Sequence, residues 1–264
     1  MLAMEVDMIS ERGGRRYNED ACGHLPSDTG LCCVLADGAG GHGGGDVAAR
    51  QVVKELLLAF AERPQRSGAD MAASIHKAND VLIASRAPGP TQDMHTTVVC
   101  LVIDAIDQRA HWGHAGDSRL YWFRDGKILW RTRDHTVVQS LADAGLWKLD
   151  ALKEHPQGNE LVSALGMPSD ALTISISEEP SLVEAGDVFL LCSDGCWEYL
   201  DDAALLHSLA TASTPKAWLN DLAAQITAAP LDNKSKSHDN FTAMAVWVSA
   251  MPVVQGMAAA TEGA

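Results

Sequence analysis

Acidic residues stand at the ends of several apolar segments of this 264-residue chain. Asp37-Gly38 follows the apolar run Leu31–Ala36, and Asp194-Gly195 follows Leu190-Leu191-Cys192 in the same order. Further acids near the ends of predicted strands are Asp117, Asp239 and the pair Glu19-Asp20. Carboxylates that converge in a folded interior repel one another, and divalent cations relieve that repulsion. Because the candidate ligands are carboxylate and carbonyl oxygens, the pattern favours magnesium or manganese over zinc or copper.

The Asp37 segment allows two other interpretations. An Asp-Gly pair alone is most often a simple turn, and only its recurrence favours a metal site. Gly38, Gly40 and Gly43 also satisfy the G-x-G-x-x-G pattern of dinucleotide-binding loops. Asp37 would repel a pyrophosphate at that place, and the Gly-Lys-Ser/Thr of a P-loop is absent. The dinucleotide interpretation is therefore disfavoured.

Composition narrows the range of partners and locations. With 35 acidic and 20 basic residues the formal net charge is -15, which disfavours nonspecific binding to nucleic acids or anionic membranes. Six cysteines lack the spacing of a zinc or redox site, which favours reduced thiols in the core. The first residues lack the order of a secretion signal, and no apolar stretch is long enough to span a membrane. We expect a cytoplasmic protein.

Hydrophobic periodicity predicts the elements that position these acids. The predicted strands are 31–36, 96–103, 109–114, 119–123, 127–131, 172–176, 187–192 and 241–248. The predicted helices are 47–62, 68–85, 136–145, 202–212 and 215–228, the last with Thr214 as its cap. Asp125-Gly126 predicts a tight hairpin between two of the strands. Successive strands without intervening helices indicate antiparallel sheets, with helices layered outside them.

An ordered set of short motifs resembles the type 2C family of metal-dependent serine/threonine protein phosphatases, in its bacterial form. The matching segments run from residue 12 to about residue 248, which makes the set far more specific than any one motif. They are Arg15-Arg16-Tyr17-Asn18-Glu19-Asp20, Asp37-Gly38-Ala39-Gly40-Gly41-His42, Thr96-Thr97-Val98-Val99, Gly116-Asp117-Ser118-Arg119, Asp134-His135-Thr136, Ala164-Leu165-Gly166, Ser193-Asp194-Gly195 and Asp239-Asn240-Phe241-Thr242.

The resemblance implies an α+β fold with four layers, αββα, in which two antiparallel sheets pack together between helices. It implies one phosphatase catalytic domain over residues 1–248, followed by a frayed tail over 249–264. Residues 145–169, which are polar and hard to assign, are predicted to form a surface flap over the site.

The resemblance also assigns roles around two core metal ions, manganese or magnesium. Asp37 bridges the two ions, Asp194 and Asp239 complete the coordination of one, and the Gly38 carbonyl with Glu19 or Asp20 serves the other. A water shared by the two ions would attack phosphorus.

Three further positions are assigned less firmly by the resemblance. Asp117 matches the residue that holds a third metal together with Asp194; the alternative is a turn carboxylate paired with Arg119. Arg15 matches the arginine that grips the substrate phosphate, a task suited to a forked guanidinium, whereas Arg16 is expected to face solvent.

One departure concerns the general acid. Eukaryotic relatives have a histidine two residues after the bridging Asp, and Ala39 stands there in this chain. His42 is interpreted as a loop residue. The expected partners are phosphorylated proteins and an opposing serine/threonine kinase, with the phosphatase acting as a monomer. The alternative from another class is a catalytically inactive relative that only binds phosphoproteins.

Overall fold

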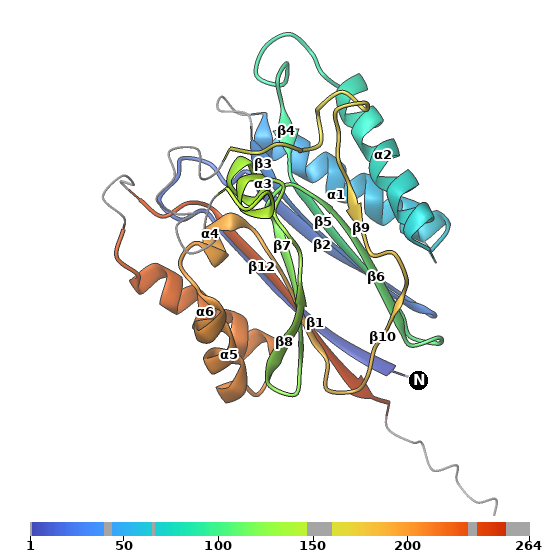
Figure 1. The fold of residues 1–264 in the computed structure, drawn as a ribbon, viewed down its shortest axis with the longest axis vertical. Coiled ribbons are helices and arrows are strands. Elements are labelled where there is room, and N and C mark those ends of the chain that lie inside the picture. Colours follow the sequence, from blue (N-terminus) through green and yellow to red (C-terminus); the bar gives the residue numbers. More distant parts are fainter. Residues whose placement is uncertain (1, 40–43, 65–66, 147–159, 232–236, 252–264) are drawn as a thin grey trace, which may run out of the picture.

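Two antiparallel sheets pack face to face in the computed structural model, which describes residues 2–39, 44–64, 67–146, 160–231 and 237–251 (Figure 1). The first sheet has the strand order β1-β12-β11-β7-β8, and the second has β10-β6-β5-β3-β2, with β4 paired to β3 and β9 paired to β6. The strands are β1 Leu2–Glu11, β2 Asp20–Ser27, β3 Gly30–Ala39, β4 His95–Thr96, β5 Val98–Asp104, β6 Arg109–Ala115, β7 Arg119–Arg124, β8 Lys127–Arg131, β9 Ser175–Ile176, β10 Ser181–Leu182, β11 Val188–Cys192 and β12 Phe241–Ala250.

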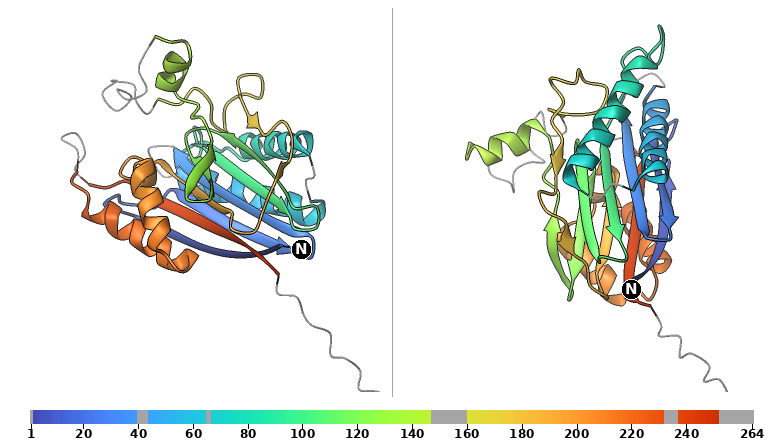
Figure 2. Two further views of the ribbon diagram at one scale, coloured as in Figure 1. Left: turned by 60° about the horizontal axis from the view of Figure 1, so that its bottom comes forward. Right: turned by 90° about the vertical axis from the view of Figure 1, so that its right-hand side faces the viewer.

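Helices cover both outer faces, so that four layers form as expected (Figure 2). Helices α1 and α2 lie on the second sheet, and α5 and α6 lie on the first. The helices are α1 Gly45–Glu62, α2 Gly68–Ala84, α3 Val137–Asp143, α4 Asp194–Trp197, α5 Asp202–Thr211 and α6 Pro215–Ala228. Within the described residues, no helix combines the length and apolarity needed to cross a membrane.

Burial of both faces explains the continuous apolar run that ends at Asp37. Along β3, Cys32, Val34 and Ala36 pack against the helical layer of α1 and α2. Leu31, Cys33 and Leu35 point the other way, into the core between the two sheets. Because neither face of β3 meets water, the strand contains no polar alternation.

Local sequence signals set the ends of several elements. Thr214 accepts a hydrogen bond from the Ala217 N–H at the start of α6, where Pro215 occupies the first turn. Asp125 and Gly126 both have positive φ angles, 51° and 68°, which suit the two-residue hairpin between β7 and β8. The predicted cap of α6 and the predicted hairpin are thus confirmed.

Several predicted boundaries were wrong. Strands β1 and β2 were not predicted, nor was the short helix α4. The predicted strand 172–176 shrinks to β9, and β12 continues through Ala250, two residues beyond the predicted end of that strand. Residues 252–264 of the predicted tail lie outside the described residues.

The predicted flap is partly a buried segment. Within it, Ser163, Ala164 and Leu165 are almost completely buried. Leu165 and Thr96 exchange two backbone hydrogen bonds of 2.8 and 3.0 Å, which fix this part of the segment beside β4. Residues 147–159 lie outside the described part of the chain.

Candidate metal centre

Asp37 and Gly38 lie near the end of β3, where hydrogen bonds to both the N–H and the carbonyl of Asp37 fix the backbone. The Asp37 N–H donates to Thr97 Oγ1 at 2.9 Å, and the Asp37 carbonyl accepts from Thr96 Oγ1 at 2.9 Å. A Cβ atom at Gly38 would lie 2.1 Å from the Gly45 carbonyl oxygen, so only glycine fits where α1 begins against β3. The strand end is therefore rigid, which suits a residue that must hold a fixed position.

Strand β2 places a second carboxylate directly opposite the first. Asp20 pairs with Asp37 in the antiparallel register of β2 and β3. Asp20 Oδ2 accepts a hydrogen bond of 2.8 Å from Ser193 Oγ, whereas Asp20 Oδ1 is buried with no partner among the described residues. An unsatisfied buried carboxylate oxygen is costly unless a donor or a cation supplies the missing interaction.

The first sheet contributes two more acids at the same end of the sandwich. Asp194 starts α4 directly after β11, and Asp239 directly precedes Asn240 and β12. Asn240 connects these segments: its side-chain amide donates to the carbonyls of Arg12 (2.8 Å) and Tyr17 (2.9 Å). The same side chain accepts from the Glu19 N–H at 2.9 Å. Residues far apart in sequence are thereby fixed around one acidic group.

Burial and mutual repulsion perturb these carboxylates strongly. Burial is the largest cause that raises the pKa of Asp37 well above its usual range, followed by the charges of Asp194, Asp20 and Asp117. The pKa of Asp194 is likewise well above normal, through burial and then the charge of Asp117. Burial raises the pKa of Asp20 to about 6 and that of Asp117 to about 7. Without cations, this cluster retains protons that exposed carboxylates release.

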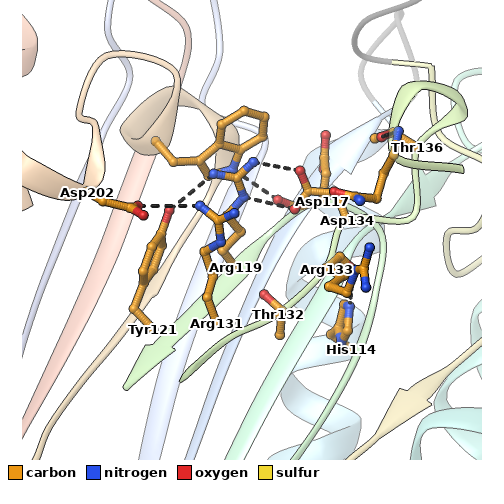
Figure 3. Close-up of polar contacts among 12 residues, drawn as sticks. His114, Asp117, Arg119, Tyr121, Arg131, Thr132, Arg133, Asp134, Thr136 and Asp202 are labelled. Carbon is orange, nitrogen blue, oxygen red and sulfur yellow. Dashed lines mark hydrogen bonds and ion pairs between the residues drawn. The ribbon is translucent and has the colours of Figure 1, made fainter. Parts of the chain in front are cut away.

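Asp117 is not the partner of Arg119, contrary to the alternative considered for it. Figure 3 shows the Arg119 guanidinium between Asp134 and Tyr121, with bonds of 2.8 and 2.7 Å to the two Asp134 oxygens and 3.1 Å to the Tyr121 hydroxyl. Its Cζ also lies 3.6 Å from the centroid of the Trp197 ring. The Trp197 indole N–H donates to the Asp117 carbonyl at 3.0 Å, which ties this network to the acidic cluster.

The predicted arginines lie at the rim. Arg15 is exposed and forms an ion pair with Asp239, so its guanidinium reaches the acidic cluster. Arg16 is exposed and its Cζ lies 5.2 Å from the Tyr17 ring centroid, as expected for a solvent-facing neighbour. At the position where eukaryotic relatives have the histidine, Ala39 is exposed at the end of β3. His42 lies outside the described residues.

Sequence reasoning gave no role to several residues that position the acids. Thr96, Thr97, Ser193 and Asn240 bond to the backbone or side chains of the acidic segments, as described above. These residues could have been identified from the sequence, because each is a polar residue close to an acid or to the end of a buried strand. A polar side chain in such a position needs a hydrogen-bond partner.

The chemistry of the cluster fits divalent cations. The converging groups are carboxylates around the Gly38 peptide; hard cations prefer oxygen ligands, and Asp20 Oδ1 lacks any partner in the described chain. Within the described residues, no group of three or more His, Cys, Asp or Glu side chains is already arranged for metal binding. Asp239 is paired with Arg15 and Asp20 with Ser193, so side chains must turn for all to coordinate. The ligand set therefore remains a proposal.

Comparison with known proteins gives consistent matches. The family model described as protein phosphatase 2C matches residues 10–234. The serine/threonine protein phosphatase PstP of Mycobacterium tuberculosis is 33% identical over 213 residues, which are 79% of this chain and 39% of the relative. The chain thus spans about two fifths of that relative's length. The protein phosphatase PhpP of Streptococcus pneumoniae is 27% identical over 220 residues, covering 81% of this chain and 87% of the relative.

Solved structures agree in fold. The crystal structure of the M. tuberculosis phosphatase PstP/Ppp aligns with a TM-score of 0.78 at 27% identity, covering 94% of this chain and 99% of that one. A structure of the PstP catalytic domain in complex with two manganese ions aligns with a TM-score of 0.75 at 27% identity, covering 95% and 100% of the two chains.

Proposed function

The chain belongs to the protein phosphatase 2C family, and from that membership we propose that it hydrolyses phosphoserine and phosphothreonine in proteins, using manganese or magnesium. The observation that carries the proposal is the cluster of perturbed carboxylates between the ends of the two sheets. Asp37 and Asp194 are half-buried, their pKa values are raised well above the usual range, and neither forms an ion pair among the described residues, which together are typical of a functional site.

The proposed ligands follow from the geometry and the resemblance together. Asp37 would bridge two ions, with Asp194 and Asp239 on one ion and the Gly38 carbonyl with Glu19 or Asp20 on the other. Asp117 would join Asp194 at a third ion. Bound at these residues, the cations would supply a shared water of lowered pKa as nucleophile and would neutralise the phosphoryl oxygens.

The chain's own residues would bind and orient the phosphate. Arg15 is long, exposed and already at the acidic cluster, so it can turn from Asp239 to a substrate phosphate once cations occupy the carboxylates. Ala39 cannot transfer a proton, so protonation of the leaving serine or threonine oxygen would fall to water. No cysteine serves as nucleophile: burial is the largest cause raising the pKa of Cys192 to about 12 and that of Cys196 well above normal.

We further propose a cytoplasmic monomer that opposes a serine/threonine kinase. All six cysteines are free, and five are buried, which suits a reducing compartment. The manganese-bound PstP domain supports the choice of metal.

The test is release of phosphate from a phosphothreonine peptide with Mn²⁺, after EDTA, and after Mn²⁺ is restored. The proposal predicts activity that EDTA abolishes and Mn²⁺ restores. The variant Asp239→Asn should have no activity but the same circular dichroism spectrum as the wild type. An inactive phosphoprotein-binding relative would bind the phosphopeptide and release no phosphate. Release that is insensitive to EDTA would overturn the metal-dependent mechanism.

A further inference from the structure

A cavity of about 470 Å³ opens along the side of the sandwich, between the edge of one sheet and the edge of the other. One wall comes from β7 and its terminal neighbour β8, and the other from β6 and the segment from β9 to β10. Its lining residues include Trp112, Trp122, Trp130, His114, Glu178 and Glu179. We refer to it as the tryptophan cavity.

Three indole rings meet in the tryptophan cavity, with Trp112 from the β6 wall and Trp122 and Trp130 from the β7 and β8 wall. The Trp112 ring centroid lies 4.4 Å from that of Trp130 and 6.0 Å from that of Trp122. Indole faces attract cations, and the Arg124 Cζ already lies 5.1 Å from the Trp122 centroid. The aromatic cluster therefore tolerates a guanidinium group as a neighbour.

Two carboxylates at the rim lack a counter-charge from the chain. Glu178 and Glu179 are both exposed and line the cavity. No ion pair within the described residues involves either one; the nearby Glu184 and Asp187, by contrast, both pair with Arg124. Aromatic faces beside unpaired carboxylates favour a cationic ligand over a neutral or anionic one.

Two deeply buried side chains of the cavity each retain one polar atom without a partner in the described chain. His114 is 3% exposed and Trp122 is 5% exposed, and the unpartnered atoms are His114 Nδ1 and Trp122 Nε1. His114 Nε2 lies 2.8 Å from the Arg133 carbonyl, which can only accept, so Nε2 carries the hydrogen. Nδ1 is then an acceptor, whereas the indole N–H is a donor.

These requirements describe one ligand chemistry. A guanidinium supplies N–H donors for His114 Nδ1 and the glutamates, and a planar cation for the indoles. The carbonyl of an extended peptide backbone supplies the acceptor for Trp122. Arginine within an extended segment provides both the planar cationic donor and the carbonyl acceptor. A free amine or a neutral side chain provides only some of these groups.

We propose that the tryptophan cavity binds an arginine side chain on an extended segment of the protein substrate, and thereby favours phosphoproteins with arginine near the phosphorylated residue. This inference rests on the phosphatase function proposed above, which makes the bound protein a substrate. His114 stands three residues before Asp117, so these two residues lie at most about 11 Å apart along the backbone. A single substrate segment can therefore reach both the cavity and the acidic cluster.

Binding is tested first without phosphate. The probe is a nine-residue Gly/Ser peptide with one central arginine, and its control replaces arginine by the neutral isostere citrulline. Titration calorimetry on the full chain should show at least tenfold weaker binding of the citrulline peptide. The double variant Glu178→Gln/Glu179→Gln and the single variant Trp130→Leu should each lose most of this preference. Glu5→Gln/Glu62→Gln, which removes the same charge from exposed positions elsewhere, should retain it.

Catalysis is tested with phosphothreonine peptides that carry arginine or citrulline at each position up to five residues from the phosphothreonine. We expect about tenfold higher kcat/KM for arginine in one or two adjacent registers, lost in Glu178→Gln/Glu179→Gln. Hydrolysis of p-nitrophenyl phosphate should be unchanged in that variant. Equal rates for arginine and citrulline in every register, or equal binding in the calorimetric test, would overturn the proposal. If no phosphate is released from any substrate although arginine binds selectively, the phosphatase function fails and the binding site stands.

Discussion

Asp117 and Asp134 are both buried acids near Arg119, yet only Asp134 has a cation from the chain itself. Asp134 is 8% exposed and binds the Arg119 guanidinium through both oxygens. Asp117 is 5% exposed, and burial raises its pKa to about 7 although Arg119 lowers it. The acid of a structural ion pair has its cation within the chain, whereas Asp37, Asp117 and Asp194 of the proposed metal centre have no ion-pair partner among the described residues, and a cation from solution would supply that charge.

The largest expected effect comes from removing a carboxylate that has no cationic partner among the described residues. Asp194→Asn should lower kcat with Mn²⁺ by at least about a thousandfold, because loss of a metal ligand removes several kcal/mol of transition-state stabilisation. Its melting temperature in EDTA should equal or exceed that of the wild type, since one source of repulsion is gone. A marked fall in stability in EDTA would show that Asp194 is structural, like Asp134.

For Asp134, which is paired with Arg119, we expect the substitution to lower stability. Asp134→Asn leaves the buried Arg119 guanidinium without its carboxylate, and should cost about 3–5 kcal/mol in the free energy of unfolding. Urea denaturation in EDTA measures this cost without any contribution from metal. The double variant Arg119→Met/Asp134→Leu should recover much of the loss. A single variant as stable as the wild type would contradict the assignment of this pair as structural.

A smaller effect on rate is expected at the rim. Arg15→Ala should lower kcat/KM by roughly 10- to 100-fold, because one charge-assisted contact to the substrate phosphate is lost. The affinity for Mn²⁺, measured by titration calorimetry, should not fall, since Asp239 loses a competing partner. Arg16→Ala is the matched control and should change kcat/KM less than twofold. A larger loss in Arg16→Ala than in Arg15→Ala would shift the assignment by one residue.

The smallest effect concerns pH in the absence of metal. The folded-state pKa values of Asp20 and Asp117, about 6 and about 7, lie above the ordinary aspartate value of 3.8. The stability that these two groups contribute is therefore fully present below about pH 4 and is lost as pH rises through 6 to 7. In EDTA the melting temperature should fall by several degrees between pH 5 and pH 8. Saturating Mn²⁺ should remove or reverse this trend, because the ions bind deprotonated carboxylates.

The fold could be predicted where a strand is buried on both faces or a turn has a distinctive pair of residues. β3, β11 and the hairpin at Asp125-Gly126 belong to this group. β1 was missed although Met4, Val6 and Met8 alternate with Glu5 and Asp7, because its acidic residues obscured the apolar face. β2 contains Gly23 and Pro26, which lower strand propensity and are tolerated because β2 lies at the edge of its sheet.

The site could be predicted as a list of acids, but its supporting contacts could not. Asn240 reaches Glu19 across 221 positions of sequence, and Ser193 reaches Asp20 across 173. Such pairs depend on how the sheets assemble, which periodicity and residue type do not specify. Likewise, the sequence suggested only Asp117 as a partner for Arg119, and the observed pairing with Asp134 depends on the position of the loop after β8.

The pairing of β1 with β12 also constrains the order in which this fold can form during synthesis. Ser10 Oγ and Thr242 Oγ1 lie 2.8 Å apart although 232 positions separate them, and the two strands pair along their whole lengths. A ribosome must therefore release residues 241–250 before β1 finds its partner, and contacts of such long range close slowly. β1 is the terminal strand of its sheet, so one of its edges stays open even after β12 has paired, and the acidic side chains of Glu5 and Asp7 discourage other chains from pairing there. Because Asp239 directly precedes β12, the proposed metal site cannot be complete until this part of the chain has left the ribosome.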